Sequence, residues 1–212
     1  MYRAVSYILL MLSISITSMA QSQGEKEKVK QAFKNYKQAI LNDEGSKAVS
    51  YTDSKTLKYY NTALHKIKHA DSLDLINMKR LDRFTVLAIR YRANKDEIMK
   101  FNGRSLFEYA INAGMVGKGS VMNNTIGDVE INGNTAKGRL LVNEAVTPFQ
   151  LHFNKESGRW KVDITSIFPV AENAFDKMIK NSSMDENMYL MMILSMMSNE
   201  APKNEVWKAV AG

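Results

Sequence analysis

Apolar residues in the first half of the chain recur at steps of three and four, which is the spacing of an amphipathic helix. Four large side chains follow this spacing: Val29, Phe33, Tyr36 and Ile40. Residues 22–25, Ser-Gln-Gly-Glu, fit a capping box at the start, and Gly45 is a helix stop signal. The pattern predicts a first helix between residues 22 and 44 that packs by one apolar stripe.

Further helices are predicted up to residue 113. Asp53 is a good N-cap, and it precedes a second apolar stripe of four residues: Leu57, Tyr60, Leu64 and Ile67. Residues 73–91 place apolar side chains on more than one helical face, which predicts a largely buried helix. Its end, residues 84–89, is rich enough in branched side chains to form a strand instead. A short helical turn at 97–100 and a helix at 104–113 complete this half.

After Gly114 the pattern changes to alternation, the period of a β-strand. Four strands are predicted, at residues 121–131, 135–143, 147–155 and 159–168. Asn132-Gly133-Asn134 and Glu156-Ser157-Gly158 are tight-turn sequences, so neighbouring strands should pair as antiparallel hairpins in a meander. Pro169 ends the last strand, and helices are predicted at 170–180 and in the methionine-rich run 184–198.

The predicted fold class is therefore α+β. N-terminal helices pack on a curved antiparallel sheet of about four strands, and a methionine-rich helix follows at the carboxyl end. No repeat or low-complexity linker divides the chain, so residues 21–212 are expected to form a single domain with a helical C-terminal extension.

The amino terminus has the layout of a cleavable secretory signal. Arg3 precedes an apolar run from residue 4 to 16, and Ser18-Met19-Ala20 resembles a processing site before Gln21. An uncleaved membrane anchor is the alternative, but the apolar run is shorter than the roughly 20 residues that a spanning helix needs. We predict a signal peptide at residues 1–20 and export to the periplasm or the medium of a bacterium, with no stable membrane insertion after cleavage.

The amino-acid composition excludes several kinds of functional site. The chain contains no cysteine, which excludes disulfides, thiolate catalysis and cysteine-ligated metals. Its formal net charge of +7 would favour anionic partners, but the lysines of the first helix alternate with Glu25 and Glu27, as on an ordinary solvated face. No nucleic-acid partner is predicted. Attachment to anionic polymers is an alternative that requires a continuous basic patch.

Two segments of the predicted sheet carry a family resemblance. They are Gly133-Asn134-Thr135-Ala136 and residues 153–163, Phe-Asn-Lys-Glu-Ser-Gly-Arg-Trp-Lys-Val-Asp. Both resemble the last strands of the nuclear transport factor 2-like superfamily, which includes SnoaL-like and ketosteroid isomerase-like proteins, and the first helix is similar to that family's opening element. The resemblance implies a cone-shaped α+β fold in which helices cover the concave face of a curved sheet and leave a pocket. It implies no particular reaction, because the superfamily holds isomerases, dehydratases, polyketide cyclases and carrier domains.

Strand parity selects the candidate ligand-binding residues. Side chains two apart share a face, so the large apolar groups of the last two strands should face the helices, joined by two tyrosines of the covering helices. The predicted pocket residues are Tyr36, Tyr109, Phe149, Leu151, Phe153 and Trp160. His152, Lys161 and Asp163 fall on the opposite face, in water, so no catalytic residue is predicted.

Other chemical patterns are weaker. His65 and His69 lie four apart on a helix, but no third ligand accompanies them, so neither a metal nor a cofactor is predicted. Residues 114–120 are similar to a phosphate loop but lack its essential positions, which leaves a connector. The methionines of residues 184–197 suit Cu(I), yet their helical spacing favours packing or partner docking.

These patterns favour an exported, non-enzymatic domain that binds a small apolar ligand. A protein partner or a second copy of the chain would dock on the helix at 184–197. The alternative is an isomerase- or cyclase-like enzyme of the same fold, which needs an ionisable residue on the cavity wall.

Overall fold

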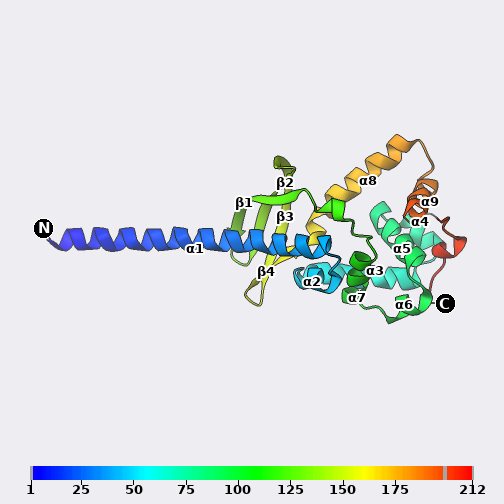
Figure 1. Ribbon diagram of the computed structural model, residues 1–212, viewed down its shortest axis with the longest axis horizontal. Helices are drawn as coiled ribbons and strands as arrows, with labels where there is room; N and C mark the ends of the chain where they lie inside the picture. Colours follow the sequence, from blue (N-terminus) through cyan, green and yellow to red (C-terminus); the bar gives the residue numbers. More distant parts are fainter. Residues whose placement is uncertain (1, 198–199, 212) are drawn as a thin grey trace.

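The computed structural model describes residues 2–197 and 200–211, with side chains described from residue 22 onward. The chain forms a long first helix, a sheet that lies along it, and a lobe of helices at the end of the sheet (Figure 1). The helices are α1 (Tyr2–Leu41), α2 (Gly45–Ser50), α3 (Ser54–His69), α4 (Ser72–Asn77), α5 (Arg80–Arg92), α6 (Lys95–Lys100), α7 (Gly103–Asn112), α8 (Phe168–Ser182) and α9 (Glu186–Met196). The strands are β1 (Asn124–Asn132), β2 (Thr135–Val142), β3 (Ala145–Glu156) and β4 (Arg159–Asp163). Among the described residues, no helix has the length and apolar content to cross a membrane.

The sheet confirms the predicted antiparallel meander, with strand order β1-β2-β3-β4. Gly133, at φ +58°, makes the first turn, and Ser157 and Gly158 make the last with φ of +48° and +76°. The prediction that the fourth strand continues to Phe168 is wrong. The strand ends at Asp163, because residues 164–167 form a 3-10 helix that leads into α8. Pro169 lies in the first turn of α8, where its missing amide costs no hydrogen bond. The chain is therefore α+β.

The outer edge of β4 is partly covered by the link between α2 and α3. The Val162 amide donates to the Tyr51 carbonyl at 2.8 Å, and the Asp53 amide donates to the Val162 carbonyl at 3.1 Å. These two bonds form a one-residue parallel bridge between Thr52 and Val162. Such cover protects an edge that would otherwise expose unpaired backbone groups.

Helix α1 packs against one face of the sheet, in contact with β1, β2 and β4. Its predicted stripe is buried in full: Val29, Phe33, Tyr36 and Ile40. The predicted parity also holds for most of the last two strands, where Leu151, Phe153, Trp160 and Val162 are all buried. The space between α1 and the sheet is thus a packed hydrophobic core.

Phe149 departs from this parity and is 38% exposed. The β2–β3 register shifts between Arg139 and Leu141, so that residues 147–149 of β3, Phe149 included, lie opposite Leu140 alone. The Thr147 hydroxyl donates to the Leu140 carbonyl at 2.6 Å and stabilises this irregularity. A bulge breaks the alternation of faces, which is the physical reason that Phe149 does not join the core.

Both predicted ends of the first helix are wrong. Helix α1 already begins at Tyr2, so residues 22–25 lie inside the helix and cap nothing. It ends at Leu41, before a turn in which Asp43 has φ +57°, and Gly45 begins α2. A Cβ at Gly45 would lie 2.5 Å from Oδ1 of Asn112, so this glycine permits close packing of α2 on α7.

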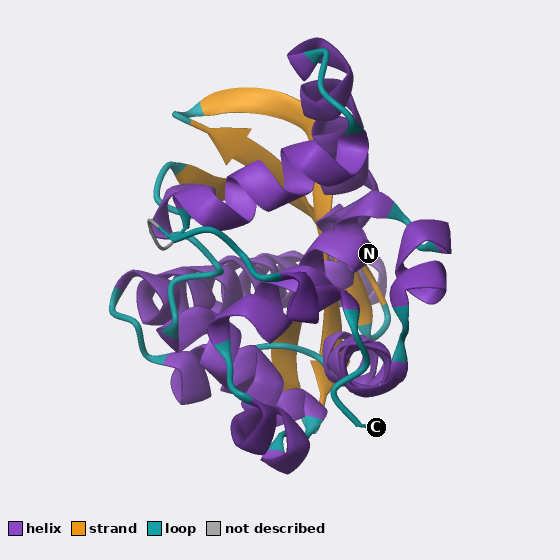
Figure 2. Cartoon of the chain, turned by 90° about the vertical axis from the view of Figure 1, so that its right-hand side faces the viewer, coloured by secondary structure: helices purple, strands orange, loops and turns teal. Residues whose placement is uncertain are grey.

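The helical lobe confirms the predicted N-cap of α3, where the Thr56 amide donates to the Asp53 carboxylate at 2.8 Å. Residues 84–89 lie in α5, so the strand alternative is wrong. The single helix predicted at 73–91 is divided into α4 and α5, and the Arg83 guanidinium donates to the carbonyls of Ile76 and Met78 at the break. In Figure 2, which views this lobe from its outer end, the strands lie behind the helices.

Candidate functional site

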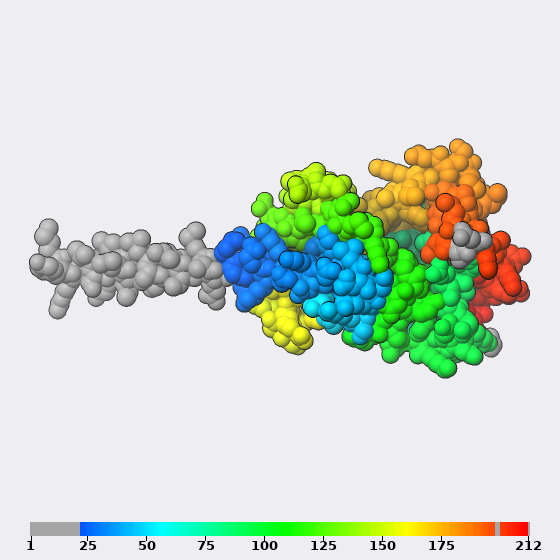
Figure 3. Space-filling view, in the orientation of Figure 1, coloured from blue at the N-terminus to red at the C-terminus, as the bar shows by residue number. Residues whose placement is uncertain are grey.

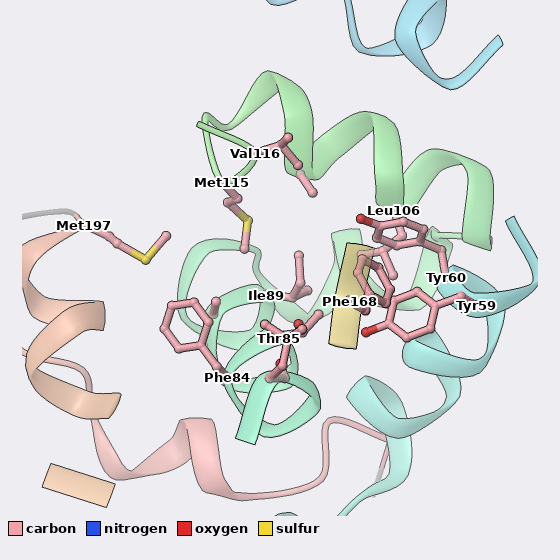
Figure 4. A pocket seen from close by; sticks show the side chains of 13 residues that line it. Tyr59, Tyr60, Phe84, Thr85, Ile89, Leu106, Met115, Val116, Phe168 and Met197 are labelled. Atoms are coloured by element: carbon pink, nitrogen blue, oxygen red, sulfur yellow. The ribbon is translucent and has the colours of Figure 1, made fainter. Parts of the chain in front are cut away.

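The largely apolar cavity of interest lies within the helical lobe and not between α1 and the sheet. Its volume is about 210 Å³, and Figure 4 shows the side chains that line it. Tyr59 and Tyr60 come from α3, and Leu106 and Ala110 come from α7. The connector after α7 adds Met115 and Val116, and the ends of two further helices add Phe168 and Met197. The remaining wall belongs to α5: Leu81, Phe84, Thr85, Ala88 and Ile89.

Helical spacing and side-chain size explain why this space exists. The lining residues of α5 recur at steps of three, four and one, which places them on one face of the helix. Ala88 and Ala110 are small and leave room between α5 and α7. Tyr60 stacks on Phe107 with ring centroids 4.1 Å apart, which holds α3 against α7 beside the cavity.

One end of the cavity is polar, and the tyrosine hydroxyls that line the cavity are neutral. The Tyr59 hydroxyl donates to Oδ1 of Asp82 at 3.0 Å, and Lys66 pairs with the other oxygen of this carboxylate at 2.8 Å. Burial, reinforced by the charge of Asp82, raises the pKa of Tyr59 far above its ordinary range. Burial raises the pKa of Tyr60 in the same way. Both phenols therefore stay protonated at neutral pH.

The six residues predicted to form the pocket do not share one cavity. Leu151 and Phe153 are buried in the core on the sheet, and Phe149 is half-exposed. Tyr36 is buried on α1, close enough to Tyr60 of α3 to help burial raise the pKa of that residue. The Tyr109 hydroxyl donates to the Arg92 carbonyl at 2.7 Å, which ties α7 to the end of α5. Trp160 is buried and donates through Nε1 to Glu25 at 3.0 Å.

The prediction that Asp163 lies in water is wrong, because its side chain is buried and the residue is only 2% exposed. The start of α3 and the 3-10 helix after β4 cover this end of the sheet's outer face. Lys55 reaches one carboxylate oxygen at 2.9 Å, and the Thr165 hydroxyl donates to the other at 2.5 Å. Both oxygens thus have partners within the fold, and Asp163 does not line the helical cavity. His152, on the same outer face, is half-buried.

The residues that form the helical cavity were missed by strand parity, because they come from helices and a connector. The sequence does carry a signal for α5, since residues 73–91 show apolar groups on more than one face. Such a helix has a second apolar face that must contact something. Nothing in residues 114–120 indicates that Met115 and Val116 close the cavity, which they do by folding back on the Ala110 carbonyl at 2.9 and 3.2 Å.

Other candidate chemistry lies on the surface. His65 and His69 are exposed, with ring centroids 4.7 Å apart. In the described parts of the chain, no group of three or more histidine, aspartate or glutamate side chains is arranged to hold a metal ion. Helix α9 buries Tyr189, Leu190 and Leu194 and exposes a stripe of methionines on another side, with Met188 62% and Met196 73% exposed.

The chain matches no protein-family model, and no characterised protein or solved structure is significantly similar to it.

Glu25 gives a testable pH dependence. Hydrogen bonds from Lys155, from Lys28 and from Trp160 lower the pKa of this carboxyl from 4.5 to about 2. A carboxyl with a lowered pKa stabilises the fold above its ordinary pKa, and this contribution is lost as the pH falls from 4.5 towards 2. We expect Glu25→Gln to remove part of the loss of stability in this window. Urea unfolding midpoints at about pH 7, 4 and 2.5 measure the effect, and parallel midpoint curves for both proteins would contradict it.

Proposed function

We propose that the protein is an exported, non-enzymatic binding domain that holds a small apolar molecule in the cavity between α3, α5 and α7. The observation that carries the proposal is the size and lining of this cavity, about 210 Å³ with mostly apolar walls. An apolar protein cavity of about 150 Å³ is enough to bind benzene. The space therefore accommodates a single-ring molecule with one or two substituents.

The polar end of the cavity defines the ligand further. The Tyr59 hydroxyl already uses its proton on Asp82, and the Thr85 hydroxyl donates to the Leu81 carbonyl at 2.8 Å. Each oxygen keeps a lone pair that can accept a hydrogen bond. A ligand with an apolar body and one hydroxyl or N–H donor, such as a small phenol, matches this arrangement better than a hydrocarbon of the same size.

Binding of para-cresol and of toluene tests this proposal. We expect both to raise the melting temperature of the protein, para-cresol at lower concentration, because a ligand at about 100 times its Kd stabilises the folded state by about 2.7 kcal/mol. Ala110→Met fills part of the cavity and should abolish the shift. Met115→Leu conserves volume and should preserve it.

A measurement on the unaltered protein tests the proposal even where a variant folds poorly. In the unaltered protein, the methyl resonances of Met115 and Met197 should move on addition of para-cresol, because both side chains line the cavity. Absence of any shift at saturating para-cresol, or full binding by folded Ala110→Met, would overturn the proposal.

An isomerase- or cyclase-like enzyme is the alternative with the same fold. Such chemistry needs an acid or base that titrates near neutral pH at the reacting atom. Among the thirteen lining residues, all described, only Tyr59 and Tyr60 ionise, and burial keeps both protonated. This lining is the reason that we favour binding over catalysis.

A partner protein or a second copy of the chain is the other proposed ligand. The exposed methionine stripe of α9, formed by Met188, Met192 and Met196, supports it, because adaptable apolar side chains suit docking surfaces. Native mass spectrometry of the protein from its own host distinguishes the two, since it reports a retained small molecule or a dimer mass. The measured mass should also be that of a chain that begins at Gln21, because we propose that residues 1–20 are a signal that is cleaved on export.

Membership in the nuclear transport factor 2-like superfamily also remains a proposal. The β3–β4 hairpin and a first helix packed on the sheet support it.

A further inference from the structure

A second hollow, of about 230 Å³, lies between α1, the end of α2 and the β3–β4 hairpin. Figure 3 shows the tip of this hairpin, in yellow, beside α1, in blue. Three cationic side chains line the hollow: Lys28, Arg159 and Lys161. Its lining residues, all of which the structure describes, include no aspartate or glutamate. This imbalance of charge distinguishes it from the apolar cavity in the helical lobe.

Two of these cations, Lys161 and Arg159, form no ion pair with the residues that the structure describes. The Lys161 ammonium donates to the Ser50 carbonyl, a neutral group. Arg159 is exposed and forms no ion pair with any residue in the described part of the chain. Burial lowers the pKa of Lys161, and the charges of Arg159 and Arg104 lower it further against the opposing effect of Glu156. A bound anion would relieve this repulsion. Lys28, in contrast, already pairs with Glu25 at 2.7 Å.

The backbone adds a neutral donor beside the cations. Both backbone groups of Val162 bond to the link between α2 and α3, at Tyr51 and Asp53. Because bonding directions alternate along a strand, the amide of Trp160, two residues earlier, faces the same edge of β4. The bridge to Thr52 ends at Val162, so Trp160 lies where the edge opens into the hollow.

We propose that this hollow binds the phosphate or carboxylate group of a small organic anion, held between Lys161, Arg159 and the amide of Trp160. On the α1 side, the Gln31 amide donates to the Asn35 carbonyl oxygen at 2.7 Å, which leaves the Asn35 amino group available for a hydroxyl of the same ligand. Charge-assisted bonds to an oxyanion are the strong ones in proteins, and a guanidinium matches two oxygens at once. This site is independent of the function proposed for the helical cavity.

Inorganic phosphate is the first probe, titrated at low ionic strength into the full chain and followed by amide NMR. We expect saturable binding that moves the amide resonance of Trp160, and a rise of the Lys161 pKa towards its ordinary value. Lys161→Gln and Arg159→Gln should each weaken binding about ten-fold or more, the effect of one charge-assisted hydrogen bond. Lys177→Gln removes the same charge from an exposed position on α8 and should change binding less than about two-fold.

Three results would overturn this inference. The first is that phosphate binding does not saturate. The second is an equal loss of affinity in all three variants, and the third is binding to heparin without saturable binding of phosphate. The second and third results would report only the diffuse positive charge of the chain. If glycerol phosphate binds no tighter than inorganic phosphate, Asn35 has no part in recognition and that element of the proposal fails. Binding of para-cresol by Lys161→Gln should equal that of the unaltered protein, so failure of one site is distinguishable from failure of the other.

Discussion

Arg90→Ala is expected to destabilise the protein by on the order of 3–5 kcal/mol, because it removes a buried guanidinium that several carbonyls share. Arg90 is largely buried in α5, and its nitrogens donate to the carbonyls of Lys66, Ile67, Ala70 and Val206 at 2.7 to 3.2 Å. Three of these carbonyls lie at the end of α3. The Lys66 carbonyl also accepts from the Ala70 amide at 2.9 Å, whereas α3 has no further amides for the carbonyls of Ile67 and Ala70. Burial lowers the pKa of Arg90 only to about 10, so it is charged at neutral pH and favoured beside a helix C-terminus.

Chemical denaturation monitored by circular dichroism measures the loss. Arg90→Lys keeps the charge but has three donors on one nitrogen, so it should recover part of the stability and not all of it. Arg80→Ala is a useful comparison, since Arg80 is more exposed and pairs with Asp176 and Glu186 near the surface. It should cost about 1 kcal/mol. Similar losses for Arg80→Ala and Arg90→Ala would show that the buried carbonyls do not depend on Arg90.

Phe153→Ala should cost about 3–5 kcal/mol, as expected for a large aromatic side chain deleted from a packed core. Phe153 is 1% exposed and lies between α1 and the middle of the sheet, paired across strands with Ala136 and Val162. The space left by the ring cannot close easily, because the regular pairing of β2, β3 and β4 fixes the backbone around it.

Phe149→Ala is the matched control, on the same strand and with the same change of side chain. Phe149 is 38% exposed and lies within the bulge in β3, so its loss should cost about 1 kcal/mol or less. Urea unfolding of both variants gives the comparison. A near-equal loss of unfolding free energy in the two variants would contradict the prediction that Phe153 contributes more to the core than Phe149. Binding of para-cresol by folded Phe153→Ala tests, in addition, whether the residues between α1 and the sheet take part in ligand binding.

The sequence alone predicted the features that depend on local periodicity. The stripe of α1, from Val29 to Ile40, needs only the helical spacing of apolar residues. Two of the three β-hairpin turns follow from a glycine at a position with positive φ, Gly133 in the first and Gly158 in the last. Burial of Leu151 and Trp160 follows from the two-residue period of a strand that is paired without interruption. Each of these depends on neighbours within a few residues, which a sequence displays directly.

Tertiary structure decided what depends on contacts between distant segments. Asp163 is buried because Lys55, more than a hundred residues earlier, reaches it across the end of the sheet. The helical cavity is bounded by α3, α5, α7 and Met197 near the end of α9, so it exists only once those segments meet. Nothing in the sequence distinguishes Arg90 from a surface arginine. It binds the carbonyls at the end of α3 only because the fold places that end beside it. Periodicity says which side of a helix or strand turns inward, but packing of whole elements determines what that side meets and whether space is left between them.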